Sequence, residues 1–128
     1  MTESLKEAVL AAELGEDPVG AVVVVNRRVV GKAHHQTKSL RDPTAHAEMI
    51  ALTQAAEVAG QSPGKGITLV ATEMPCPMCL EAAKLNGVRR IIYGSKRKQA
   101  VSSKIALSGP VLPKECAALR RNQKVFRC

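Results

Sequence analysis

Apolar and polar positions along the chain predict helices and strands in turn. Apolar residues recur at helical spacing near the N-terminus, which predicts a helix over residues 3–14 that ends at Gly15. Ser4 and Glu7 fit a capping box at its start. Residues 20–25 are a glycine, an alanine and four valines, a run typical of a strand buried on both faces.

The same pattern continues through the rest of the chain. Residues 26–28 predict a turn and residues 29–33 an antiparallel partner strand. Two helices are expected over residues 45–59 and 75–86, with Gly87 capping the second. The remaining expected elements are strands over residues 67–72, 88–93 and about 105–107, and a last helix over residues 113–121.

This order of elements predicts an α/β fold. Strands that are separated by helices need crossover connections, and the crossovers place helices on both faces of a sheet. We therefore expect a three-layer α-β-α sandwich with a central mixed sheet of about five strands. A chain of 128 residues suits one compact domain, so residues 1–128 are expected to form a single domain.

Composition indicates what kind of core and which cellular compartment to expect. Aromatic residues make up only 2% of the chain, so the core must be aliphatic. No apolar run reaches the roughly 18 residues that suggest a membrane span, and the charged N-terminus is unlike a secretory signal. We therefore expect a cytoplasmic protein that has no membrane segment.

The net charge of +8 is unevenly placed. Residues 1–83 hold seven Lys or Arg and ten Asp or Glu, a balance of −3, whereas residues 84–128 hold twelve and one, a balance of +11. Such asymmetry indicates a nucleic-acid partner, although a solvated basic surface gives the same pattern.

Two segments carry candidate chemistry, and each lies at the expected start of a helix. The segments are residues 43–48 and 75–79. In residues 75–79, Cys76 and Cys79 are three residues apart, so in a helix both could reach one metal ion from one face. The positive end of a helix also favours thiolates. Pro77 suits the first turn, where its missing N–H is not needed.

Residues 43–48 supply a histidine and a carboxylate. At the first turn of a helix, His46 and Glu48 can lie on either side of a ligand beyond the helix end. One His and two Cys leave one zinc position for water, which is typical of catalytic sites. Zn²⁺ lowers the pKa of that water, and Glu48 could take its proton and return it to a leaving ammonia.

Other interpretations exist for each half of the pattern. A Cys-x-x-Cys pair alone could be a redox pair, half of a structural zinc site or two core thiols. A redox pair would not need the His-x-Glu segment, and a structural site would need a fourth ligand, whereas Cys116 and Cys128 have no such spacing. We interpret Cys116 as a small buried helix residue and Cys128 as an exposed terminal thiol.

The two segments together match the signature of zinc deaminases, H-x-E followed by P-C-x-x-C. The chain resembles the cytidine and nucleobase deaminase superfamily, and within it the bacterial tRNA-specific adenosine deaminases and related guanine and cytosine deaminases. The resemblance is carried by residues 17–22, 42–52, 75–79, 91–94 and 115–119. It implies attack of zinc-bound hydroxide on an amino-bearing ring carbon, and it implies a homodimer.

The resemblance also implies a substrate pocket, and the chain departs from the family in three ways: at His35, at Met74 and in a shorter C-terminal region that is poor in aromatic residues. The implied substrate-binding residues are His35, Ala47, Val19 and Pro75. His35 replaces the usual Asn, and a single ring nitrogen cannot copy the paired hydrogen bonds of an amide. Met74 replaces the usual Glu or Ser, and we favour a packing role for it. The C-terminal tail offers one Phe for base stacking, which weakens the tRNA interpretation.

Three functions remain open from the sequence. The first is conversion of adenosine to inosine in tRNA, with tRNA or another single-stranded nucleic acid as partner. The second is deamination of a free base or nucleoside, such as guanine or cytosine. The third is a non-catalytic RNA-binding subunit. The candidate phosphate contacts are Arg89, Arg90, Lys96, Arg97, Lys98, Arg120, Arg121, Lys124 and Arg127.

Overall fold

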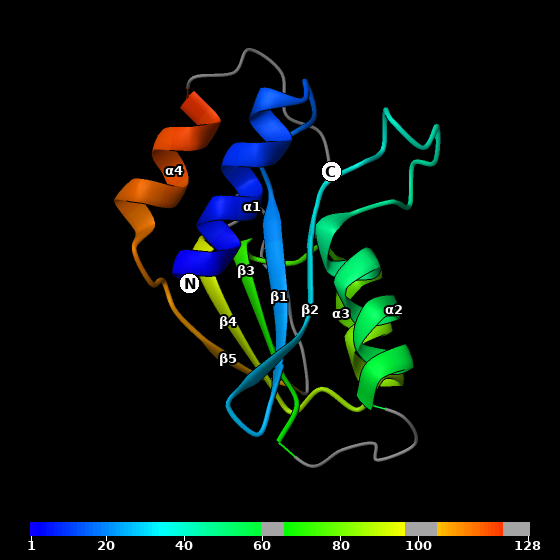
Figure 1. Cartoon of the computed structure of the whole chain (residues 1–128). Coiled ribbons are helices and arrows are strands. Elements are labelled where there is room, and N and C mark those ends of the chain that lie inside the picture. The colour runs from blue at the N-terminus through cyan, green and yellow to red at the C-terminus, as the bar shows by residue number, and fades with distance from the viewer. Residues whose placement is uncertain (60–65, 97–104, 122–128) are drawn as a thin grey trace.

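A mixed five-stranded sheet lies between two layers of helices in the computed structural model, which describes residues 1–59, 66–96 and 105–121 (Figure 1). The elements are α1 (Thr2–Glu13), β1 (Gly20–Val25), β2 (Arg28–His34), α2 (Ala47–Ala59), β3 (Thr68–Glu73), α3 (Pro77–Leu85), β4 (Arg90–Ser95), β5 (Ala106–Ser108) and α4 (Pro113–Arg121). The strand order is β2-β1-β3-β4-β5. β1 is antiparallel to both its neighbours, whereas β3, β4 and β5 are parallel.

The two helix layers confirm the expected three-layer sandwich. Helices α1 and α4 contact each other over one face of the sheet, and α2 and α3 contact each other over the opposite face (Figure 1). None of the helices in the described ranges combines the length and the apolar character needed to cross a membrane.

The hairpin of β1 and β2 forms as the sequence predicts. The first four residues of β1 are buried, in line with its run of small and β-branched side chains. Asn26 and Arg27 both have positive φ, at 51° and 63°, which is the backbone of a tight hairpin turn. The turn joins Val25 to Arg28, and one register shift lies between Val23 and Val24.

Two glycines let the helices lie close to this hairpin. A Cβ at Gly20 would lie 2.0 Å from the Ser4 carbonyl oxygen of α1. A Cβ at Gly31 would lie 2.3 Å from the Ala51 carbonyl oxygen of α2. Because both neighbours are backbone atoms, any larger residue would push a helix off the sheet.

The predicted capping box at the start of α1 is wrong. The helix begins at Thr2, with Met1 as its N-cap, and no side chain caps it. Ser4 therefore lies inside the first turn, where it is fully buried and donates its hydroxyl hydrogen to the Val70 carbonyl, 2.9 Å away. The Ser4 hydroxyl, which the local pattern assigned to capping the helix, thus binds β3 instead.

Two helices begin later than predicted, and this changes the setting of the candidate ligands. α2 begins at Ala47 rather than residue 45, so His46 precedes it. α3 begins at Pro77 rather than residue 75, and Cys76 is its N-cap, with extended backbone at φ −73° and ψ 168°. The cysteines are therefore not both within the helix. The other described elements lie within two residues of their predicted bounds.

Candidate metal centre

Three buried side chains converge beside the ends of β2, β3 and β4. The Sγ atoms of Cys76 and Cys79 are 3.6 Å apart, and Nδ1 of His46 lies 3.6 Å from the first and 3.4 Å from the second. All three residues are buried. Tetrahedral Zn²⁺ with ordinary Zn–S and Zn–N bonds separates such atoms by roughly 3.5 to 3.8 Å, so the donor set fits this ion.

A short turn delivers His46 to this group. Asp42 Oδ1 accepts hydrogen bonds from the Thr44 backbone N–H and hydroxyl, at 2.8 and 2.6 Å. These bonds lower the pKa of Asp42. The His46 N–H then bonds to the Thr44 carbonyl at 2.8 Å, and the His46 carbonyl accepts from Ile50 in the first turn of α2. Asp42 therefore shapes the backbone that precedes His46.

The cysteines are positioned by the connection from β3 to α3. Met74 N–H bonds to the Ser95 carbonyl at 2.8 Å, which ties this connection to β4. The Cys76 carbonyl accepts from Leu80 and so opens the helix. The hydrogen bond between the thiols, together with burial, raises the pKa of Cys79. A thiol of this kind ionises when it binds a metal ion.

Glu48 lies beside the metal group without belonging to it. The side chain is 4% exposed, and its Oε1 atom has no hydrogen-bond partner. Burial raises the pKa of Glu48 to about 7, although its own backbone N–H and the Cys79 thiol act in the opposite direction. A carboxyl group whose pKa lies near neutrality can both accept and return a proton.

His35 follows β2 and stacks on the candidate ligand His46. The ring centroids are 4.7 Å apart and the rings are inclined by 30°. His35 is 3% exposed, and neither ring nitrogen has a hydrogen-bond partner. Burial, followed by the nearby charge of His46, lowers the pKa of His35 to about 4, so the ring is neutral near pH 7.

The other implied substrate residues are buried near the same end of the sheet. Val19 is 7% exposed, and its carbonyl accepts the His35 N–H at 3.0 Å. Ala47 and Pro75 are fully buried, next to His46 and Cys76 in the chain. Their positions are compatible with pocket walls, and their substrate contacts stay predictions.

Sequence reasoning missed Glu16, which fixes the loop after β2. Its carboxylate is 1% exposed and accepts the backbone N–H groups of Lys38 and Ser39, at 3.0 and 2.7 Å, as well as the Ser39 hydroxyl. Burial alone would raise the pKa of Glu16, but these hydrogen bonds outweigh it and lower the pKa. The sequence signal for this role is only an acidic residue that follows Gly15.

Cys116 lies apart from the metal group, as predicted. It is 2% exposed in α4, and a Cβ on Gly94 of β4 would meet its Sγ atom at 2.1 Å. Burial raises its pKa to about 11, which makes it an unreactive thiol. Cys128 lies outside the described residues.

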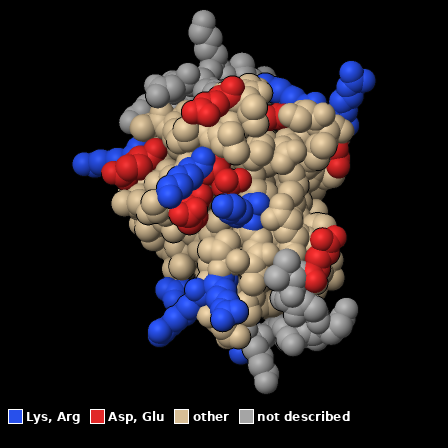
Figure 2. Space-filling view, in the orientation of Figure 1, with Lys and Arg blue, Asp and Glu red and all other residues tan. Residues whose placement is uncertain are grey.

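The predicted phosphate contacts divide between the two ends of the sheet. Lys96 directly follows Ser95 at the metal end. Arg90 begins β4 at the opposite end, next to Arg89, where the β1–β2 turn also lies. Figure 2 shows basic side chains gathered at that lower end of the molecule. Arg97, Lys98, Lys124 and Arg127, and the side chains of Arg120 and Arg121, lie outside the described part of the chain.

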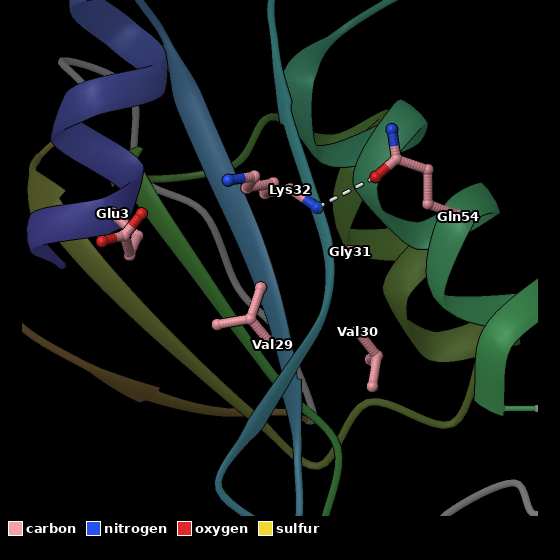
Figure 3. A pocket seen from close by; sticks show the side chains of 6 residues that line it. All are labelled: Glu3, Val29, Val30, Gly31, Lys32 and Gln54. Carbon is pink, nitrogen blue, oxygen red and sulfur yellow. Dashed lines mark hydrogen bonds between the residues drawn. The ribbon is translucent and has the colours of Figure 1, made fainter.

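A separate pocket lies on the outer edge of the sheet. It measures ≈ 340 Å³ and is formed by α1, β2 and α2 (Figure 3). Gln54 Oε1 accepts the edge N–H of Lys32 there, at 3.0 Å. The residues around this pocket are Glu3, Val29, Val30, Gly31, Lys32 and Gln54. None of them belongs to the metal group.

Comparison with known proteins gives one family and several relatives. Residues 1–95 match the sequence model of the cytidine and deoxycytidylate deaminase zinc-binding region. The tRNA-specific adenosine deaminase of Bacillus subtilis is 39% identical over 95 residues, 74% of this chain and 59% of that protein. The tRNA(Ile)-lysidine synthase of Thermus thermophilus is 41% identical over 127 residues, 95% of this chain and 24% of that protein.

Solved structures give the same fold. A structure from studies of A-to-I editing by tRNA:A34 deaminases at the wobble position superposes with a TM-score of 0.86 and 30% identity, over 93% of this chain and 96% of that one. The guanine deaminase of Nitrosomonas europaea superposes with a TM-score of 0.83 and 18% identity, over 94% of this chain and 80% of that one.

Proposed function

Because the chain belongs to the cytidine and deoxycytidylate deaminase zinc-binding family, we propose that it hydrolytically deaminates a nucleobase, with adenosine in tRNA as the substrate. Zn²⁺ is the cofactor of this family. The observation that carries the proposal is the combination of a His-Cys-Cys donor set with a buried carboxyl group that lies outside it.

Each residue has a role in this proposal. His46, Cys76 and Cys79 hold the metal, which supplies a Lewis acid and an activated water when bound. Glu48 takes the proton of the attacking water and delivers it to the departing amino group, so the sum of the reaction is water consumed and ammonia released. Its burial keeps bulk water from competing for that proton.

Two kinds of relative support tRNA as the substrate. The tRNA-specific adenosine deaminases and the tRNA(Ile)-lysidine synthases both act on tRNA by name, and both are about 40% identical to this chain where they align. The chain spans 59% and 24% of the two proteins described above, so their whole activities are not carried over. We propose Lys96, Arg89 and Arg90 as phosphate contacts.

A second candidate function is a tRNA-binding module without turnover of its own. It is favoured by one observation: the lysidine synthase match covers 127 residues, whereas the B. subtilis adenosine deaminase match covers 95. A domain of a larger tRNA-modifying protein needs only to hold the RNA. The alternative of a free-base deaminase is favoured by the short C-terminal region and its poor aromatic content, whereas the likeness to an 18% identical guanine deaminase concerns the fold alone.

The remaining proposals concern organisation. We propose that residues 1–128 form a single deaminase domain, that the protein forms a homodimer, and that it acts in the cytoplasm, where tRNA is found. Sedimentation of the zinc-loaded protein at several concentrations tests the dimer.

The deciding experiment is incubation of the zinc-loaded protein with bulk tRNA, adenosine, guanine, cytosine and cytidine. Ammonia release together with inosine in digested tRNA would support the main proposal. Turnover of a free base only would favour the free-base alternative. Binding of tRNA without ammonia from any compound would favour the module without turnover.

A further inference from the structure

The loop of residues 36–45, which leads directly into His46, is folded on a buried carboxylate. Glu16 lies outside this loop and is 1% exposed. It accepts the backbone N–H groups of Lys38 and Ser39, at 3.0 and 2.7 Å, and the Ser39 hydroxyl. A buried carboxylate is costly unless donors surround it, and hydrogen bonds to a charged acceptor are stronger than neutral ones. Glu16 therefore ties the first half of the loop firmly in place.

Glu16 is itself held by the end of α1. Its backbone N–H donates to the Ala11 carbonyl at 2.9 Å, so the carboxylate starts from a fixed backbone. The Lys38 ammonium group donates to the Gly15 carbonyl at 3.1 Å, which is a second tie between the same two segments. The 36–45 loop thus takes its position from the helix α1.

Backbone hydrogen bonds carry this position along the loop to the metal group. The Asp42 N–H donates to the Thr37 carbonyl at 3.1 Å, and the Ala45 N–H donates to the Asp42 carbonyl at 3.0 Å. The Gln36 N–H closes the loop on the Ala45 carbonyl at 3.0 Å. Ala45 is 4% exposed and directly precedes His46. The segment that Glu16 holds is therefore connected by hydrogen bonds to the residue before the candidate ligand.

The position of His46 matters because three donor atoms must meet at one ion. Its Nδ1 atom lies 3.6 Å from the Cys76 Sγ atom and 3.4 Å from the Cys79 Sγ atom. His46 precedes α2, so the loop rather than the helix determines where its backbone lies. A ligand on a loosely held loop would have to be ordered when the metal binds, and the lost conformational entropy would weaken binding. A loop that is already folded avoids this loss.

We propose that Glu16 is a positioning residue of the metal centre: by folding the 36–45 loop it places His46 against Cys76 and Cys79, and so raises the affinity for Zn²⁺. The inference rests on the metal centre of the proposed function and not on its substrate. Glu16 does not belong to the group of metal-binding side chains, so its effect acts through the loop.

A purely structural role for Glu16 would lower stability without any special effect on the metal. Ser4→Ala is the matched control, because it removes a buried hydrogen bond between α1 and β3 that is not part of the loop. Ser39→Ala removes only the hydroxyl bond and keeps both backbone bonds to Glu16. Glu16→Gln keeps the length of the side chain, but one of its two acceptor oxygens becomes an amide nitrogen that would face a donor.

The first experiment measures zinc affinity by competition with a chelator, at neutral pH and at a temperature where circular dichroism shows that each variant is folded. We expect Glu16→Ala to bind zinc about 10- to 100-fold more weakly, the usual cost of losing a residue that orients a metal ligand. Glu16→Gln should be intermediate, and Ser39→Ala and Ser4→Ala should stay close to the parent.

The zinc affinities also define what would contradict the proposal. Parental affinity in folded Glu16→Ala, or an equal loss in Ser4→Ala, would overturn it. If Glu16→Ala does not fold, Glu16→Gln decides the matter: parental zinc affinity in that variant would overturn the proposal, and a loss that Ser4→Ala does not show would support it.

The second experiment asks whether the effect passes through His46. Zinc affinity is measured for His46→Ala with and without Glu16→Ala, because the two cysteines can still bind the metal more weakly. If Glu16 acts by placing His46, its removal should cause no further loss in this background. A loss of the same size in both backgrounds would overturn the proposal, since the loop would then support the cysteines or the fold as a whole.

The outcomes distinguish this inference from the proposed function. If the parent makes inosine and Glu16→Ala keeps parental zinc affinity, the inference fails and the proposed function stands. If zinc affinity depends on Glu16 through His46 but the parent releases ammonia from none of the tested compounds, the proposed function fails and the inference stands.

Discussion

At the scale of single residues, the side chains near the metal group differ in whether their polar atoms have hydrogen-bond partners. The three ligand atoms lie within 3.4 to 3.6 Å of one another, whereas Glu48 Oε1 and both His35 nitrogens have no partner. A residue of the first kind should control metal content. A residue of the second kind should control what happens to a bound substrate.

Glu48→Ala tests this division. We expect turnover to fall by about 10²- to 10⁴-fold, the usual contribution of a group that transfers protons. Zinc content should stay at the parental level, because Glu48 is not a member of the ligand group. Ammonia release and metal analysis on the same sample measure both quantities. Glu57→Ala, an exposed carboxylate on the same helix, is the matched control. Parental turnover in Glu48→Ala would refute the assigned role.

Glu16→Ala tests the hydrogen bonds by which the Glu16 carboxylate holds the loop after β2, which we call the Glu16 clamp. The substitution leaves two backbone N–H groups and one hydroxyl without their acceptor. We expect the free energy of unfolding to fall by about 1 to 3 kcal/mol. Urea unfolding measures this, with Glu13→Ala, an exposed residue at the end of α1, as the control. Equal stability of the two variants would contradict the clamp.

The Glu16 clamp should also depend on pH. The folded-state pKa of Glu16 lies below its ordinary value of 4.5, so the stabilisation is fully present above that pH. It is lost as the pH falls through the lower folded-state pKa. The difference in unfolding free energy between the parent and Glu16→Gln should therefore shrink in acid. Urea unfolding at a series of pH values from 7 to 3 measures it, and a constant difference would argue against an ionised clamp.

At the scale of elements, both ligand-bearing segments enter their helices from extended or turn backbone. Cys76 precedes Pro77, and a residue before proline avoids the helical region, which accounts for the late start of α3. Asp42 forms the turn before His46, which accounts for the late start of α2. His46 and Cys76 thus lie just outside their helices, whereas Cys79 lies in the first turn of α3.

Gly31→Ala tests how tightly α2 must lie on β2. The new Cβ would meet the Ala51 carbonyl oxygen at 2.3 Å, and the helix would have to shift. We expect a loss of about 1 to 3 kcal/mol in stability. Because α2 carries Glu48, turnover should fall too, by about tenfold or more.

Gly66→Ala is the control for this substitution. Its φ of 66° strains any side chain, but no atom lies within 4 Å of the added Cβ. It should lower stability without lowering turnover at a temperature where both variants are folded. Full turnover of folded Gly31→Ala would show that the position of α2 is not limiting.

Local pattern predicted most of the fold, and long-range contacts account for what it missed. The valine run of β1 and the turn after it identify their elements without tertiary information. The hydroxyl of Ser4 bonds to Val70, 66 positions away, so no local rule could reveal it. The stack of His35 on His46 and the clamp by Glu16 depend on loops that meet only in the folded chain. The meeting of His46, Cys76 and Cys79 was predictable because each motif is local in the sequence, whereas the pocket around them is not.

At the scale of the whole molecule, the described residues place one basic group, at the start of β4 and the β1–β2 turn, at the end of the sheet opposite the metal group. The metal group lies beyond the C-terminal ends of β3 and β4, while Arg89 and Arg90 lie where β4 begins. A six-residue strand spans roughly 17 Å, so these arginines cannot touch a base at the metal group. Arg27 and Arg28, in the β1–β2 hairpin, are exposed at the same end. An RNA that reaches both ends would have to be larger than a single nucleoside.

Removing Arg89 and Arg90, at the start of β4, tests this arrangement. Arg89→Ala with Arg90→Ala should weaken tRNA binding, and the slope of log affinity against log salt should become shallower by about 1.5, the value for two lost phosphate contacts. Zinc content, and turnover of a short stem-loop that covers only the metal end, should stay parental. Lys6→Ala with Lys84→Ala removes the same charge from exposed positions on α1 and α3 and is the control. Equal slopes for the two double variants would mean that the basic end of the sheet carries solvated charge and binds no phosphate.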